Sequence, residues 1–506
     1  MTLHPEIIQI STEDNIGIIV NPLGLADGTD IGEGIVLKER IPMGHKVALK
    51  KIIPNDPIIR YGHTISYAEK IIEKGEWVNE NNTSLPPSPP LESLATNVSN
   101  SREKVSLTDY TFEGFKNEDG SVGTKNILAI STSVQCVAGF TEHVVKKIKE
   151  ELLPKYENVD DVVGLSHSYG CGVAINAPAA IIPIRTIQNI ARNPNFGNEC
   201  MVLGLGCEKL RPERIASSSN DDVFYMQDNA YQGFGEMMDG AMKIAEKHLS
   251  KINARKRETC PASALVVGMQ CGGSDAFSGI TANPVAGYAA DLIVKAGGSV
   301  MFSEVTEVRD AIELLVNRAA NSDVAKALIH EMQWYDDYLE QGHADRSANT
   351  TPGNKKGGLS NIVEKALGSV VKSGTTTIVG VVPPGEKLTE KGLNFAATPA
   401  GDFVCGTLQL AAGMNMHLFM TGRGTPYGLS SVPVIKISSN TTLSNRWHDL
   451  IDFDAGRMIS ERKSLEELGW ELFHLILDVA SGKKTVASDK LKLYNDLVLF
   501  NPGPLT

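Results

Sequence analysis

Four short segments of this chain place a cysteine next to a glycine. They are Gly170-Cys171-Gly172, Gly206-Cys207, Cys271-Gly272-Gly273 and Cys405-Gly406. Cysteine is a soft metal ligand or a reactive thiol, and glycine lets the backbone approach a ligand closely. Most of these segments follow a short apolar run that is typical of a strand. Because α/β proteins bind and react at loops beyond the carboxyl ends of strands, the pattern predicts a thiol-lined site built from distant loops.

Three further residues have types suited to proton transfer. Gly44-His45-Lys46 is either a solvated surface turn or a histidine ligand or base beside a lysine. Lys125 follows the turn at Asp119-Gly120 and stands at the entrance of an expected strand, where it would meet an anion. The segment 166–172 packs His167, a tyrosine and Cys171 together, which a structural turn rarely needs. His167 is therefore a candidate base or ligand, and Cys171 a candidate ligand.

The glycine-rich segment 268–279 follows an apolar run and offers backbone N–H groups to an anion. Its Cys271 and Asp275 add metal-ligand chemistry, although a tight structural loop with an inert thiol is the alternative. The spacing of its glycines matches neither the Rossmann nor the Walker pattern, and segment 422–428 also fails the Rossmann spacing. Dinucleotide binding is therefore not expected.

Cations lie on two flexible loops. Lys355 and Lys356 stand between glycines in segment 352–358, and Arg423 lies in Gly422-Arg423-Gly424. A single such lysine is usually solvated, but cations held between glycines in an acidic protein suit carboxylate recognition. Glu304, Glu307, Arg309 and Asp310 follow another expected strand. They form either a salt-bridged helix start or part of a cation site.

Composition limits the possible classes of protein. The chain has 506 residues, a net charge of -12, 42% hydrophobic and 21% charged residues, which indicates two to four soluble domains and no nucleic-acid partner. No secretory signal and no apolar run of roughly 18 residues is present, so no membrane partner and a cytoplasmic location are expected. The cysteines number seven, without C-x-x-C spacing, which excludes a disulfide framework and a zinc ribbon.

Patterns along the chain predict an α/β multidomain protein. Residues 1–78 form a small β-rich module with strands at 16–20, 34–37 and 46–49. Residues 79–106 are rich in Pro, Ser and Asn and predict a long, extended linker. Residues 107–255 predict a middle α/β domain with strands at 126–130 and 161–165 and helices at 140–153 and 235–252. Residues 256–506 predict a mostly parallel sheet with strands near 264–269, 299–302, 376–382, 417–420 and 433–437.

Together these segments resemble the altronate/galactarate hydro-lyase family over nearly the whole chain. The resemblance is carried by Gly44-His-Lys-Val-Ala48, Asp119-Gly-Ser-Val-Gly-Thr-Lys-Asn126, Tyr169-Gly-Cys-Gly-Val-Ala-Ile-Asn-Ala-Pro-Ala179, Gly204-Leu-Gly-Cys-Glu-Lys209, Cys271-Gly-Gly-Ser-Asp-Ala-Phe-Ser-Gly279, Ser347-Ala-Asn349 with Pro352-Gly-Asn-Lys-Lys-Gly-Gly358, and Gly422-Arg-Gly-Thr-Pro-Tyr-Gly428.

The resemblance implies three domains and one reaction. It implies a β-clip (SAF-like) N-terminal module, a middle domain that supports a homodimer, and a Rossmann-like C-terminal domain with a metal site. The implied reaction removes water from galactarate, a dicarboxylate sugar acid, to give 5-dehydro-4-deoxy-D-glucarate, and it requires ferrous iron (Fe²⁺).

This chemistry needs a base for the proton α to a carboxylate, a Lewis acid for the enediolate, and cations for the far carboxylate. As hypotheses, His45, Lys125 and His167 are candidate catalytic residues. The candidate metal ligands are His45, Cys271, Asp275, Glu304 and Cys405, and the candidate substrate-binding residues are Lys46, Lys355, Lys356 and Arg423.

Three alternatives remain open at this stage. The first is a dehydratase for altronate or another sugar acid, which has one terminal carboxylate to hold. The second is a non-catalytic aldarate-binding protein, which would keep the basic loops without needing the cysteines. The third is an iron–sulfur redox protein, and the absence of clustered cysteines in the sequence counts against it.

Overall fold

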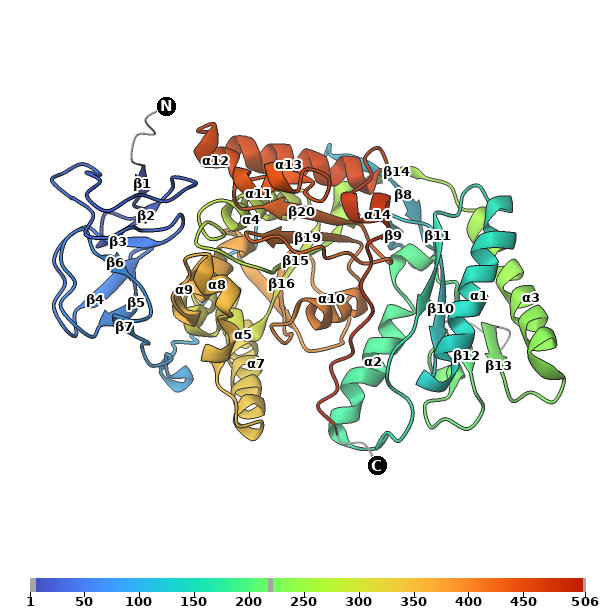
Figure 1. The fold of residues 1–506 in the computed structure, drawn as a ribbon. Coiled ribbons are helices and arrows are strands. Elements are labelled where there is room, and N and C mark those ends of the chain that lie inside the picture. The colour runs from blue at the N-terminus through green and yellow to red at the C-terminus, as the bar shows by residue number, and fades with distance from the viewer. Residues whose placement is uncertain (1–5, 217–221, 504–506) are drawn as a thin grey trace.

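The computed structural model describes residues 6–216 and 222–503. The chain is an α/β protein of several domains, with a β-rich module at the N-terminus, a middle parallel sheet and a larger C-terminal sheet (Figure 1). This confirms the predicted fold class at that level. Among the described residues, no helix is long and apolar enough to cross a membrane.

Two small antiparallel sheets build the N-terminal module. One has the order β1 (Ile7–Ile8), β2 (Ile16–Ile19), β3 (Lys46–Ala48), β6 (Trp77–Val78), and the other the order β4 (Pro57–Arg60), β5 (His63–Ala68), β7 (Thr83–Ser84). The strands expected at 16–20 and 46–49 are confirmed. The strand expected at 34–37 is wrong, because the turn-rich sequence around it leaves an isolated bridge between Asp30 and Val36.

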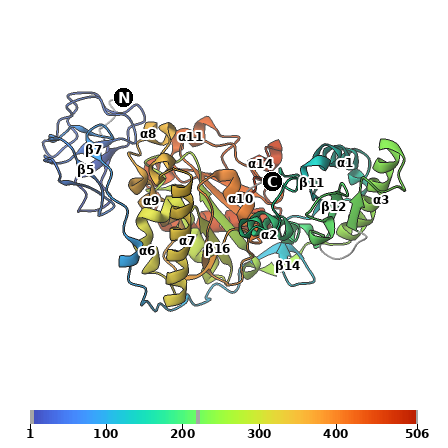
Figure 2. The same ribbon diagram turned by 90° about the horizontal axis from the view of Figure 1, so that it is seen from below.

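The segment between β7 and the middle domain is extended, with one 3₁₀ turn at Leu91–Ser93. Hydrogen bonds attach this segment to the C-terminal domain. Arg346 donates to Pro86 O at 3.0 Å and Arg309 to Pro89 O at 3.0 Å, and Asn100 donates to Ala319 O at 2.8 Å. The segment therefore runs along the C-terminal domain toward the middle domain (Figure 2).

The middle domain holds a parallel sheet of order β11 (Asp161–Leu165), β10 (Ile127–Thr132), β12 (Cys200–Gly204), β13 (Val223–Tyr225). Helices α1 (Ala138–Glu151) and α3 (Gly233–Asn253) cover one face with apolar residues, and α2 (Ile181–Ile190) covers the other. Both expected strands and both expected helices are present. A small antiparallel sheet of β14 (Glu258–Pro261), β8 (Thr111–Lys116) and β9 (Val122–Gly123) joins this domain to the next.

The C-terminal sheet has seven parallel strands in the order β17 (Ile378–Val382), β18 (Leu393–Ala396), β16 (Ser299–Ser303), β15 (Val266–Cys271), β19 (Met416–Thr421), β20 (Val434–Ser438), β21 (Phe453–Asp454). All five expected strands are present, whereas the short β18 and β21 were not foreseen. The chain adds β16 on one side of β15 and β19 on the other. A crevice is expected at the carboxyl end of β15, where the order reverses.

Helices cover both faces of this sheet. They are α4 (Ala282–Lys295), α5 (Val305–Val308), α6 (Ile312–Val316), α7 (Ser322–Gln341), α8 (Pro352–Lys356), α9 (Ile362–Val370), α10 (Asp402–Ala411), α11 (Thr441–Arg446), α12 (Arg457–Ser460), α13 (Leu465–Ala480) and α14 (Ala487–Leu491). Helix α4 packs on α13 at one face, and α10 packs on α2 of the middle domain at the other.

Helices α2 and α10 meet near their C-terminal ends. Asn193, just beyond α2, donates to Leu410 O and Met414 O at the end of α10, at 3.2 and 2.9 Å. The contact between these two helices joins the middle domain to the C-terminal domain.

Candidate active site

A buried group of charged side chains lies at the carboxyl edge of the C-terminal sheet. Cys271 ends β15, Glu304 follows β16, and Glu307 lies in α5. Lys372 places its ammonium 3.3 Å from Cys271 Sγ and 3.1 Å from Glu304 Oε2. Lys365 of α9 lies 2.7 Å from Glu307 Oε1. The topology thus brings two carboxylates, two ammonium groups and a thiol together where the strand order predicts a site.

The surroundings give the two carboxyl groups, Glu304 and Glu307, different pKa values. Burial and the neighbouring Glu307 raise the pKa of Glu304 to about 8. Burial opposes ionisation of Glu307 too, but Lys365 and Lys372 lower its pKa. Two neighbouring carboxyl groups with pKa values pushed apart are suited to separate acid and base roles. At neutral pH Glu304 is the proton-carrying acid and Glu307 the anion.

The same group also has the chemistry of a metal site. Cys271, Glu304 and Glu307 bring ligand atoms within 4.8 Å of one another, and a mixed thiolate and carboxylate set suits iron. However, Lys372 lies between these ligands, and burial raises the pKa of the Cys271 thiol to about 11. A divalent ion would have to displace the Lys372 ammonium, which already contacts Cys271 Sγ and Glu304 Oε2. The residues as arranged do not fit a ferrous ion.

Two other predicted metal ligands are engaged elsewhere. Asp275 accepts hydrogen bonds from Ser278 N, Ser439 Oγ and Asn440 Nδ2 at 2.9, 2.8 and 3.1 Å. It therefore holds its loop against the end of β20. Cys405 is fully buried in α10, and burial raises its pKa well above the ordinary value.

A basic rim, defined here as His45, Lys355, Lys356 and Arg423, surrounds the loop after Cys271. His45 Nε2 lies 3.3 Å from Lys356 O and donates to it as a neutral ring. Arg423 N donates to Gly273 O at 2.9 Å. Burial and the adjacent Lys46 lower the pKa of His45, so its imidazole is neutral at pH 7. The structure thus gathers four predicted residues from three distant segments.

Lys46 does not belong to this rim. Its ammonium donates to both oxygens of Glu364 in α9, at 3.0 and 2.9 Å, and to Gly358 O at 2.6 Å. Arg60 pairs with the same carboxylate. All three side chains are buried, so Lys46 fastens the N-terminal module to the C-terminal domain.

Lys125 and His167 lie in the middle domain, apart from the buried group. Lys125 pairs with Asp489 at 2.8 Å. His167 Nε2 donates to Thr132 O at 2.7 Å, and its Nδ1 accepts from Tyr169 N at 3.2 Å. Burial lowers the pKa of His167 to about 4, so it is a neutral histidine that braces the loop after β11.

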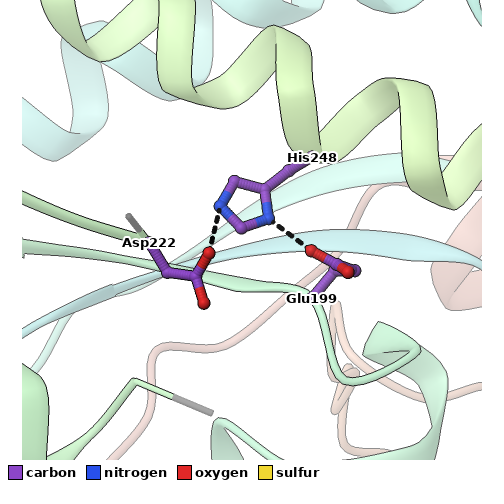
Figure 3. A group of neighbouring side chains, drawn as sticks. All are labelled: Glu199, Asp222 and His248. Carbon is purple, nitrogen blue, oxygen red and sulfur yellow. Dashed lines mark hydrogen bonds and ion pairs between the residues drawn. The ribbon is translucent and has the colours of Figure 1, made fainter. Parts of the chain in front are cut away.

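A second group with metal-ligand chemistry consists of Glu199, Asp222 and His248. Figure 3 shows the His248 ring between the two carboxylates, 2.7 Å from Glu199 and 3.5 Å from Asp222. Glu199 precedes β12 and Asp222 precedes β13, so this group lies at the amino edge of the middle sheet. Reactive sites of parallel sheets lie at the opposite edge. It is a candidate cation site, and no ion is assigned to it.

Comparison with known proteins identifies the family. Residues 5–86 match the altronate/galactarate dehydratase SAF domain, residues 114–253 the second domain of D-galactarate dehydratase/altronate hydrolase, and residues 262–505 the C-terminal domain of D-galactarate/altronate dehydratase. The chain belongs to the D-galactarate/altronate dehydratase family.

Three relatives align with almost the full length of this family member. Galactarate dehydratase (L-threo-forming) of Escherichia coli is 58% identical over 99% of this chain and 97% of its own. Altronate dehydratase of Bacillus subtilis is 32% identical over 98% and 99%. Altronate dehydratase of Escherichia coli is 31% identical over 98% and 99%.

Sequence inspection of this dehydratase-family chain missed Lys365, Lys372, Glu364 and Arg60. One signal was available. Lys365 and Lys372 are seven residues apart in a segment whose other residues are mostly apolar, and the structure places Lys365 in the buried helix α9 and Lys372 in the 3₁₀ turn that follows it. Cations on an apolar helix indicate buried partners.

Proposed function

We propose that this protein dehydrates galactarate. The observation that carries the proposal is the 58% identity to a galactarate dehydratase over almost the full length of both chains. The altronate dehydratases are only 32% and 31% identical, so altronate is the less favoured substrate. Dehydration breaks one C–H bond and one C–O bond, releases water, and leaves an enol that tautomerises to the keto acid. No electrons are gained or lost overall.

The basic rim would bind a carboxylate of the substrate. Arg423 presents a planar, bidentate donor, and Lys355 and Lys356 add point charges. His45, which is neutral, is able to accept a proton there as a general base. Lys125 and His167 are left out of this proposal because Lys125 is paired with Asp489 of α14, and His167 is held by backbone groups of Thr132 and Tyr169.

Glu304 would supply the proton for the departing hydroxyl. A carboxylic acid with a pKa of about 8 keeps its proton at neutral pH and is suited to general-acid catalysis. Glu304 is 1% exposed, so this role requires the α5–α9 side of the site to open toward the substrate.

Ferrous iron, a homodimer and a cytoplasmic location complete the proposal. When bound, iron would supply Lewis acidity for the developing enediolate. Because Lys372 fills the Cys271 group, no step is assigned to an ion there.

The test is direct. Anaerobic protein supplied with Fe²⁺ is mixed with galactarate, and keto acid formation is followed over time. We expect turnover that is lost on chelation and restored by iron, and a larger kcat/KM for galactarate than for altronate. Binding of galactarate without keto acid formation would instead indicate an aldarate-binding protein, and a larger kcat/KM for altronate would reverse the substrate assignment.

A further inference from the structure

Three cysteines lie at the carboxyl edge of the middle sheet. Cys136 follows β10, Cys171 follows β11, and Cys207 follows β12, and all three side chains are exposed. Strand β10 pairs in parallel with β11 on one side and β12 on the other. Since paired strands are about 4.8 Å apart, the three thiol-bearing loops leave the sheet within about 10 Å of one another.

Specific contacts hold these three loops together. Gln135 N donates to Tyr169 O at 3.1 Å, which joins the Cys136 loop to the Cys171 loop. Ser133 Oγ donates to Glu208 Oε1 at 2.5 Å, which joins the Cys136 loop to the Cys207 loop. Lys209 Nζ donates to Val173 O at 3.1 Å, which joins the remaining pair. The thiols are therefore mounted on one fixed platform.

Glycines keep this platform free of bulk beside the thiols. Gly170 has a φ of 104°, and a Cβ there would lie 2.4 Å from Ser133 O. Gly206 has a φ of 126° and is closed to a side chain by Gln227. Both positions need glycine, because the left-handed conformation and the close approach each disfavour a side chain.

We propose that Cys136, Cys171 and Cys207 ligate an iron–sulfur cluster. Thiolates are the usual ligands of such clusters. A single tetrahedral ion with metal–sulfur bonds of about 2.3 Å would need sulfur atoms about 4 Å apart. Among the described residues, the two groups whose ligand atoms come within 4.8 Å do not include these thiols. A cluster, in which iron and sulfide lie between the cysteines, spans a wider separation of sulfur atoms than a single ion does.

The cluster would retain one iron without a cysteine ligand. All seven cysteines of the chain lie in described residues, and the other four, Cys200, Cys260, Cys271 and Cys405, are buried. An iron with an open position acts as a Lewis acid toward a hydroxy acid. This assignment of a role rests on the proposed dehydration of galactarate. It places the required iron on the platform rather than at the Cys271 group, where Lys372 stands.

The experiment uses the full chain, reconstituted anaerobically with ferrous iron, sulfide and thiol, then desalted. Iron, acid-labile sulfide, visible absorption and the electron paramagnetic resonance of the reduced sample are measured. We expect about four irons and four sulfides per chain for a [4Fe–4S] cluster. Cys136→Ala, Cys171→Ala and Cys207→Ala should each lose most of the sulfide and the charge-transfer absorption. Cys200→Ala, which removes a buried thiol of the same domain, should retain them, with circular dichroism confirming the fold of every variant.

Iron without sulfide, zinc in preference to iron, or equal cluster content in Cys171→Ala and wild type would overturn the assignment. Activity is scored separately on the same samples. If wild-type protein that contains no sulfide dehydrates galactarate, the cluster proposal is wrong and the proposed function is supported. If the protein holds the cluster but forms no keto acid from galactarate, the cluster proposal is supported and the proposed function is wrong.

Discussion

Lys46 and Glu364 form a buried ion pair that joins two domains. The lysine lies in β3 of the N-terminal module, the glutamate lies in α9 of the C-terminal domain, and the ammonium lies 2.9 Å from Glu364 Oε2. Arg60 of β4 shares the carboxylate. One carboxylate therefore balances two buried cations, and the position of His45 in the basic rim depends on this contact.

Glu364→Gln should destabilise the protein by about 3–5 kcal/mol, because two buried cations lose their counter-charge. Denaturant unfolding of the variant measures this change. Lys51→Gln is the matched control. It breaks the pair with Glu73, which is 2.7 Å long and about half exposed, and should cost about 0–1 kcal/mol. Equal small losses in the two variants would show that the buried triad does not secure the module.

Acid should weaken the same contact. Burial alone would raise the pKa of Glu364, but Lys46 and Arg60 overcome it and hold the value at about 2, below the ordinary 4.5. The pair therefore contributes stability that is complete above pH 4.5 and is lost as the pH falls toward 2. The difference in melting temperature between wild type and Glu364→Gln should shrink below pH 4.5. A difference that stays constant down to pH 2.5 would contradict the assignment.

The sequence predicted the sheets better than the side-chain partners. Long apolar runs such as Val266–Cys271 predict buried parallel strands, because their type and length leave few alternatives. Glycine-flanked residues such as Gly44-His45 and Arg423 also indicated the loops that meet at the rim. The periodicity of apolar residues, however, does not predict which loops contact one another.

The residues that were missed have their partners far away in the sequence. Glu364 meets Lys46 across 318 residues, and such pairing follows from domain docking rather than from local pattern. The thiols show the same limit. Their spacing contains no local cysteine motif, and only parallel strand order brings Cys136 to Cys171 and Cys207.

Arg346→Ala should release the segment that follows β7. Wild-type Arg346 donates to Pro86 O at 3.0 Å and pairs with Asp310 at 2.9 Å. The ion pair fixes the guanidinium, and the first contact holds backbone that would otherwise be open to proteases. Limited proteolysis followed by mass spectrometry should show faster cleavage within residues 85–106 in the variant. Arg102→Ala, which breaks an exposed pair with Glu390, should cleave at the wild-type rate. An unchanged cleavage rate in Arg346→Ala would mean that Arg346 is not needed to protect the segment from proteases.

Glu304→Gln should remove a general acid without changing its shape. With a pKa of about 8, the wild-type carboxyl loses its proton as the pH rises through 8, so kcat should fall on that limb. The variant should lose roughly 10²–10⁴ in kcat, and the limb near pH 8 should disappear from the residual activity. Glu313→Gln, on the exposed side of α6, should keep both the rate and the limb. A limb at the same pH in Glu304→Gln would assign it to another group.

Arg423→Gln tests the basic rim as a carboxylate site. A hydrogen bond between a charged donor and a carboxylate is worth about 1.5–3 kcal/mol, so KM for galactarate should rise by about 10–100-fold with a smaller change in kcat. Lys356→Gln should act in the same direction. Lys116→Gln, an exposed residue of the middle domain paired with Glu258, should leave KM unchanged. The dicarboxylate galactarate should lose more affinity than a monocarboxylate sugar acid does, because only a ligand with two carboxylates engages cations at both ends. If Arg423→Gln and Lys116→Gln give the same KM, the substrate binds elsewhere, and the platform of Cys136, Cys171 and Cys207 becomes the place to search for its carboxylate partners.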